Sequence, residues 1–148
     1  MSPEPDYKPT LPAIADVVAT TGRPDEPTLE PGLERSDEFT VSDRLVTDVG
    51  GTIGTGVLST PGMIAVMERC SAILSYQHLP EGRATVGFEV CVKHVAAALA
   101  GSVCTVHARL REIADERKLR FDVEVREGER TIGIGTHERR IITTGQLG

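Results

Sequence analysis

The chain has 148 residues, of which 39% are hydrophobic and 3% aromatic, which suits one domain with a mostly aliphatic core. Its formal net charge is −6, and no basic stripe offsets phosphate charge, so the sequence argues against a nucleic-acid partner. No apolar run reaches the roughly 18 residues that cross a bilayer, and the N-terminus lacks the basic-then-apolar order of a signal peptide. We therefore expect no membrane partner.

Cysteine usage points to the compartment. The three cysteines are an odd number without a CxxC pair, which argues against a disulfide framework and a zinc site. We therefore expect a cytoplasmic protein. The sequence shows no metal-ligand cluster, and the glycine-rich stretch VGGTIGTG lacks the Lys-Ser/Thr ending of a phosphate loop. No metal and no cofactor are predicted.

Residues 1–37 differ in composition from the rest of the chain. Seven of the nine prolines lie there, and residues 1–38 carry nine acidic side chains against three basic ones, which accounts for the net charge. Only residues 11–20 have helical apolar spacing. We predict an extended or disordered acidic arm over 1–37, with at most one short docked helix, and a folded domain over 38–148.

One long helix is predicted over residues 61–77. Thr60 supplies a hydroxyl at the N-cap and Pro61 suits the first helical position. A strand over 39–50 and a Gly/Thr-rich loop over 51–60 precede the helix. Little of the helix surface is polar, which indicates burial by a sheet. The predicted buried stripe comprises Met63, Met67, Cys70 and Leu74.

Four strand patterns follow the helix, at 85–95, 102–112, 119–126 and 131–144, the last interrupted by glycines. The short links between them predict antiparallel hairpins. The expected fold is therefore α+β, with a curved antiparallel sheet of about five strands wrapped around one central helix, the hotdog architecture. Such a sheet has exposed edges, which predicts a homodimer and leaves a larger assembly open.

Three side chains are candidates for chemistry, and each also has a structural explanation. His94 shares a strand face with Val86 and Phe88, which favours a core histidine bonded to a carbonyl. The Thr60 hydroxyl is explained by capping alone. Glu68 lies in an almost wholly apolar helix, where a carboxylate needs a donor or a proton. Spacing alone leaves an ion pair and a functional acid equally favoured for Glu68. His78, His107 and His137 are assigned no role.

Four stretches together resemble the fluoroacetyl-CoA thioesterase family of hotdog proteins over roughly residues 38–144. They are VLSTPGMIAVMERCS, TVGFEVCVKHVAAALAG, LRFDVEV and IGIGTHERRII. In that family a Thr opens the helix, a Glu follows eight residues later, and a His lies thirty-four beyond the Thr. The resemblance implies a catalytic trio of Thr60, Glu68 and His94. It also implies acyl contacts, or support for the acid, from Gly87 and Arg139.

The function implied by this resemblance is hydrolysis of a small or medium acyl-CoA without a cofactor. The nucleophile stays open between Thr60, Glu68 and water. Fluoroacetyl specificity is not implied, because the loop before the helix lacks the aromatic residue of the fluoroacetyl-specific enzyme. Two alternatives remain. One is a non-catalytic dimer that binds acyl-CoA or an acyl carrier, with Glu68 paired to Arg139. The other is a hotdog hydratase, although its expected Asp-then-His pair is missing.

Overall fold

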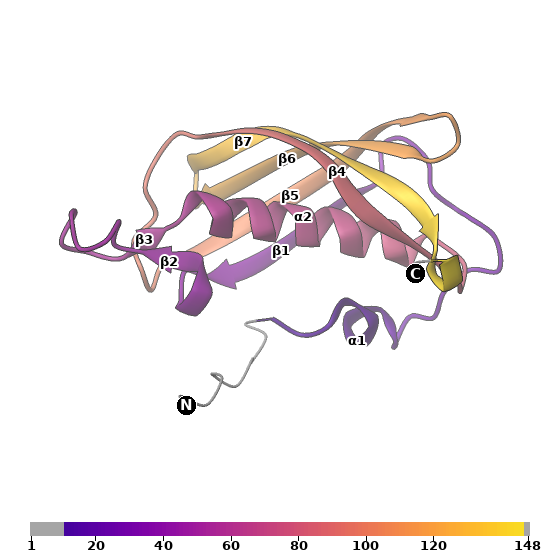
Figure 1. Ribbon diagram of the computed structural model, residues 1–148, viewed down its shortest axis with the longest axis horizontal. Coiled ribbons are helices and arrows are strands. Elements are labelled where there is room, and N and C mark those ends of the chain that lie inside the picture. Colours follow the sequence, from indigo (N-terminus) through magenta and orange to yellow (C-terminus); the bar gives the residue numbers. More distant parts are fainter. Residues whose placement is uncertain (1–10, 147–148) are drawn as a thin grey trace.

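The computed structural model describes residues 11–146 and shows one long helix lying across an antiparallel sheet (Figure 1). The helices are α1 (Ile14–Val18) and α2 (Thr60–Gln77), with short 3-10 turns η1 (Asp43–Leu45) and η2 (Thr144–Gln146). The strands are β1 (Glu34–Thr40), β2 (Val46–Thr47), β3 (Val57–Leu58), β4 (Arg83–His94), β5 (Val103–Ala114), β6 (Lys118–Glu127) and β7 (Arg130–Thr143).

The main sheet has five strands in the order β1-β5-β6-β7-β4, and all neighbours are antiparallel. Its curved face wraps around α2, while β2 and β3 form a separate small ribbon near the start of that helix (Figure 1). The α+β arrangement predicted from the sequence is confirmed. Strand β4 lies at one edge of the sheet, and this edge strand contributes His94 and Gly87.

The core lies between α2 and the inner faces of the central strands. The predicted stripe of Met63, Met67, Cys70 and Leu74 is buried, against side chains such as Phe121 of β6. Strand β7 runs through its glycines without interruption, where the sequence had suggested a broken strand. A Cβ on Gly133 would lie 2.2 Å from the Met63 sulfur, so this glycine lets the helix approach the sheet closely.

The first strand differs from its predicted position. A strand was expected over 39–50, but β1 ends at Thr40, and residues 43–45 form the turn η1 before β2. Strand β1 starts at Glu34, so its first residues come from the segment assigned to the N-terminal arm. The chain then passes through a glycine-rich loop between β2 and β3 and enters α2.

A β-bulge in β4 changes which side chains face the helix. The pairing of β4 with β7 shifts between Gly87 and Glu89, which inserts one extra residue into β4. Period-2 counting predicted an inward face that includes Val86 and Phe88, but these side chains are 42% and 60% exposed. The extra residue reverses the alternation, so that Gly87 instead of Phe88 faces α2.

The N-terminal segment packs against α2 on the side away from the sheet (Figure 1). Val18 of the short helix α1 is buried. The Arg23 guanidinium lies 3.7 Å from the centre of the Tyr76 ring and donates to the Leu79 carbonyl at 2.8 Å. The short helix α1 therefore packs against α2. Among the helices of residues 11–146, none is both long and apolar enough to span a bilayer.

Candidate active site

The start of α2 leaves the Thr60 hydroxyl available. Ser59, and not Thr60, is the N-cap, because the Ser59 hydroxyl accepts a 2.9 Å hydrogen bond from the Gly62 backbone N–H. Thr60 is the first helical residue and Pro61 the second. The predicted capping role of Thr60 is therefore wrong, and the structural explanation for its hydroxyl falls away.

Thr60 and His94 meet through their side chains. The Thr60 hydroxyl oxygen lies 2.9 Å from His94 Nδ1. The other ring nitrogen, Nε2, is buried and has no hydrogen-bond partner within residues 11–146. The sequence favoured a core histidine bonded to a carbonyl, but this ring instead binds a hydroxyl at the end of the long helix. A hydroxyl in contact with an imidazole is the usual arrangement of a nucleophile and its base.

Glu68 lies against the bulged part of β4. A Cβ on Gly87 would come within 2.8 Å of Glu68 Oε2, so the glycine makes room for the carboxylate. Arg139 Nη1 lies 3.8 Å from the same oxygen. The Glu68 side chain is 40% exposed and that of Arg139 only 9%. Glu68 therefore has its buried cation on one side and open access on the other.

Arg139 is held by three further contacts. Its Nε donates to the Thr85 hydroxyl at 2.8 Å, and Nη2 donates to the Thr85 carbonyl at 3.1 Å. Its Nη1 lies 3.2 Å from His137 Nε2. Burial lowers the pKa of Arg139, and the nearby Glu68 carboxylate raises it in part. Gly87, Glu68 and Arg139 thus form one cluster.

His137 belongs to this cluster, although no sequence pattern indicated a role for it. Its side chain is buried, and its Nδ1 lies 2.8 Å from the Glu89 carbonyl oxygen. Burial is the main cause that lowers the pKa of His137, and the Arg139 charge lowers it further. The available signal was its position two residues before Arg139, which puts both side chains on the same face of one strand.

The predicted site residues therefore form two groups within one chain. Thr60 and His94 meet at the start of α2, whereas Glu68 meets Gly87 and Arg139 about two turns further along. Eight helical residues correspond to a rise of about 12 Å. Within residues 11–146, no hydrogen bond or ion pair joins His94 to Glu68. The trio is thus only partly assembled in a single chain.

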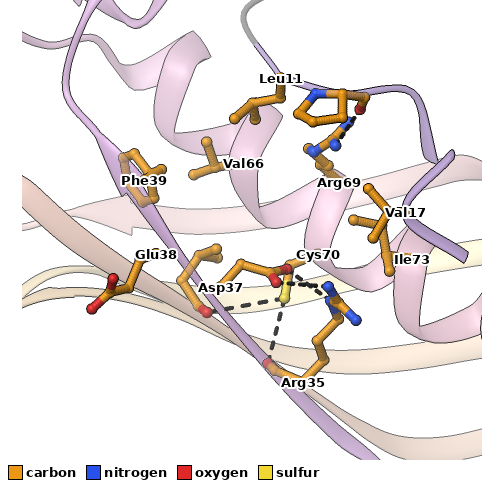
Figure 2. Close-up of a pocket in the computed structure, with 12 residues that line it drawn as sticks. Leu11, Val17, Arg35, Asp37, Glu38, Phe39, Val66, Arg69, Cys70 and Ile73 are labelled. Atoms are coloured by element: carbon orange, nitrogen blue, oxygen red, sulfur yellow. Dashed lines mark hydrogen bonds and ion pairs between the residues drawn. The ribbon is translucent and has the colours of Figure 1, made fainter. Parts of the chain in front are cut away.

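A separate cavity lies on another flank of α2, between this helix, β1 and the N-terminal segment (Figure 2). Its volume is about 190 Å³, and it is lined by none of the five predicted site residues. Cys70 opens onto it, and its thiol donates to the Arg35 carbonyl at 3.4 Å. Burial, with help from Asp37, raises the pKa of Cys70 to about 12. A thiol that stays protonated at neutral pH is a poor nucleophile, so the cysteine is structural.

Metal binding has no support in the described structure. Within residues 11–146, no group of three or more His, Cys, Asp or Glu side chains is placed to hold a metal ion.

Comparison with known proteins places this geometry in context. The family model described as "FlK: Fluoroacetyl-CoA-specific thioesterase" matches residues 41–145. A fluoroacetyl-CoA thioesterase from Streptantibioticus cattleyicolor is 36% identical over 86 residues, which are 58% of this chain and 61% of that protein. The chain thus spans less than two thirds of the length of this curated relative.

Two solved structures show the same architecture. A mutant of the fluoroacetyl-CoA-specific thioesterase FlK in complex with fluoroacetate and CoA has a TM-score of 0.73 and 27% identity, covering 81% of this chain and all of that one. A hot-dog-like protein from Thermanaerovibrio acidaminovorans has a TM-score of 0.71 and 20% identity, covering 78% and 84%. The hotdog fold expected from the sequence is confirmed.

Proposed function

Because the chain belongs to the family of fluoroacetyl-CoA-specific thioesterases, we propose that it hydrolyses an acyl-CoA thioester to the free acid and CoA. The observation that carries this proposal is the 2.9 Å contact between the Thr60 hydroxyl and His94 at the start of α2. Glu68 and Arg139 on the same side of the fold supply the charged groups. The proposal needs no cofactor. It includes a cytoplasmic location, which the three free cysteines support.

His94 acts in this proposal as the general base and acid. It takes a proton from the attacking hydroxyl or water and returns one to the CoA sulfur as the C–S bond breaks. If Thr60 is the nucleophile, a water then attacks the Thr60 ester with His94 as base, and the proton returns to the Thr60 oxygen as the free acid leaves. If the Thr60 hydroxyl donates to Nδ1, the ring proton lies on Nε2 and needs an acceptor. If Nδ1 instead carries the proton and donates to Thr60, Nε2 needs a donor. A substrate atom or a partner chain would satisfy this buried nitrogen.

The oxyanion of the tetrahedral intermediate needs hydrogen-bond donors. The helix terminus offers few free backbone donors, because the Gly62 N–H is bound to Ser59 and Pro61 has no N–H. The Thr60 hydroxyl is therefore either the nucleophile or one of the oxyanion donors. A search for a covalent acyl-enzyme by mass spectrometry separates these two roles.

We further propose that the functional unit is a homodimer joined along β4. This strand is an edge of the sheet, and its Val86 and Phe88 side chains are exposed. A second β4 would cover this edge and bring a partner chain to the incomplete site. Light scattering tests this point independently of turnover. A monomer with full activity would contradict the dimer and leave hydrolysis standing.

The acyl group is proposed to be small or medium and not restricted to fluoroacetyl. The loop between β2 and β3 contains glycine, threonine, valine, isoleucine and aspartate residues, and no aromatic side chain. Rates with a panel of acyl-CoA substrates, including acetyl-CoA and fluoroacetyl-CoA, test this specificity. A strong preference for fluoroacetyl-CoA would contradict it.

One observation favours the second candidate, a non-catalytic dimer that binds acyl-CoA. Glu68 lies beside Arg139, as that alternative predicts, although the 3.8 Å separation is long for a tight ion pair. The partial exposure of Glu68 is what a group that meets substrate or water requires. The two candidates differ in what happens when this carboxylate is neutralised.

Glu68→Gln separates the two candidates. Free thiol release from acyl-CoA should be present in the wild type and fall heavily in this variant, with melting temperature nearly unchanged. A merely structural ion pair would instead give a less stable protein, by roughly 1–3 kcal/mol, with unchanged turnover. If the wild type binds acyl-CoA and releases no thiol, the binding function replaces the enzyme.

A further inference from the structure

The hydrogen bonds of His137 define its protonation. Its Nδ1 faces the Glu89 carbonyl oxygen, which can only accept, so Nδ1 carries the proton. Its Nε2 faces Arg139 Nη1, which can only donate, so Nε2 is an unprotonated acceptor. Both contacts are satisfied together only by the neutral ring with hydrogen on Nδ1.

These two contacts connect Glu89 at the β4 bulge with Arg139 on β7. Glu89 closes the bulge in β4, and the bulge is what presents Gly87 to the Glu68 carboxylate. Arg139 is the cation beside that carboxylate. The imidazole therefore bridges the strand that makes room for Glu68 and the guanidinium that faces it.

We propose that His137 is a positioning residue for the proposed hydrolysis. Its ring fixes the Arg139 guanidinium and the bulge, and Arg139 in turn holds the Glu68 carboxylate over Gly87. The inference rests on the proposed function. His137 itself makes no hydrogen bond with Thr60 or His94 within the described residues.

Packing alone does not explain a histidine here. Its ring stacks against Phe121 with centroids 6.4 Å apart, a contact that a phenylalanine would also make. Both ring nitrogens bind polar atoms. The bond at Nε2 gives the buried Arg139 guanidinium an acceptor that a phenylalanine would not provide. The polar function of the ring can therefore be tested separately from its shape.

The kinetic test is a double-mutant cycle between His137 and Arg139. His137→Phe keeps an aromatic ring at this position. It should lower kcat roughly 10–100-fold, the range for residues that orient a functional group without touching substrate, with little change in KM. In an Arg139→Met background the same change should cost almost nothing, because the group on which His137 acts is gone. An equal loss in both backgrounds would overturn the proposal.

Two further variants serve as controls for this kinetic test. His137→Gln places an acceptor oxygen near the former Nε2 and should have a higher kcat than His137→Phe. If His137→Phe does not fold, His137→Gln replaces it in the double-mutant cycle. His107→Phe is the matched control, since His107 lies on β5, half exposed beside Glu34. It should leave kcat unchanged. A drop in melting temperature without a change in kcat for His137→Phe would reduce the residue to a structural one.

Nitrogen NMR of the wild-type protein tests the geometry without any turnover. At neutral pH the His137 ring should show the proton on Nδ1 and a free lone pair on Nε2. The opposite tautomer or a charged ring would overturn the proposal. If the wild type releases no thiol but shows this tautomer, the proposed function has failed. The hydrogen bonds from His137 to Glu89 and Arg139 would then still be correct.

Discussion

The Thr60 hydroxyl and the His94 ring lie 34 residues apart in sequence and are joined by a 2.9 Å contact. Ser59 makes this possible by taking the capping role, which leaves Thr60 free to meet the ring. The pair sits where the long helix begins and the edge strand ends. A flexible side chain from each of two rigid elements is thereby held in one relative position, as a proton-transfer pair requires.

The Thr60–His94 pair should act as a unit. His94→Ala should lower turnover by about 10²–10⁴-fold through loss of the general base. Thr60→Ala should cost as much if the hydroxyl is the nucleophile, and clearly less if it only donates. Steady-state kinetics of the single and double variants measure this. Additive losses would show that the two side chains act independently.

Gly87 should be required for the position of Glu68 and not for folding. In Gly87→Ala the new Cβ would lie 2.8 Å from Glu68 Oε2, and the flexible carboxylate is the group that can move. We expect an unchanged melting temperature and a loss in kcat of roughly 10–100-fold from misplacement of the acid. Gly145→Ala, which meets no atom within 4 Å, is the matched control. Full activity of Gly87→Ala would remove the glycine from the site.

The docked N-terminal segment should contribute to stability. Arg23→Ala removes the contact with Tyr76 and the hydrogen bond to the Leu79 carbonyl. We expect a loss of roughly 1–2 kcal/mol and a melting temperature lower by about 2–8 °C. Arg23→Lys keeps the charge over the ring and should lose less. Equal melting temperatures for wild type and Arg23→Ala would show that the segment is dispensable for the fold.

Stability should fall as the pH drops below about 6.5. Burial lowers the pKa values of His137 and His78 in the folded protein, so the unfolded chain binds protons more readily there. The stabilisation is complete above the unfolded value of about 6.5 and is lost as pH falls toward the folded values. For His137, whose side chain is buried, the loss is about 1.4 kcal/mol for each unit between the folded and unfolded pKa values.

Urea unfolding between pH 8 and pH 5 measures this dependence. The charged groups that face His137 are Arg139 on its own strand and Glu68 on α2, and burial outweighs the attraction of Glu68. His137→Gln should therefore flatten the decline between pH 6.5 and pH 5, leaving the share of His78. A decline as steep as in the wild type would show that His137 does not titrate as described.

The sequence predicted the elements whose patterns are local. The stripe of α2 and the alternation in β5 and β6 follow directly from side-chain periodicity, and both are buried as expected. The resemblance led to Thr60, Glu68 and His94, but spacing could not tell which of them touch. The contact of Thr60 with His94 depends on how the end of β4 packs against the start of α2, which residue type does not determine. His137 was missed because one of its bonds goes to the Glu89 backbone carbonyl on a neighbouring strand, a contact that no residue pattern marks.

The inserted residue in β4 also changes how spacing along this strand should be interpreted. Gly87 and His94 are separated by an odd number of positions, and in a regular strand an odd separation puts two side chains on opposite faces. Both can serve the helix side only because one position is added between them. Without Phe88 the count would be even, and a regular strand would then place both residues on the helix side. In related chains, an odd interval between this glycine and this histidine is therefore the sequence signature of an irregular strand.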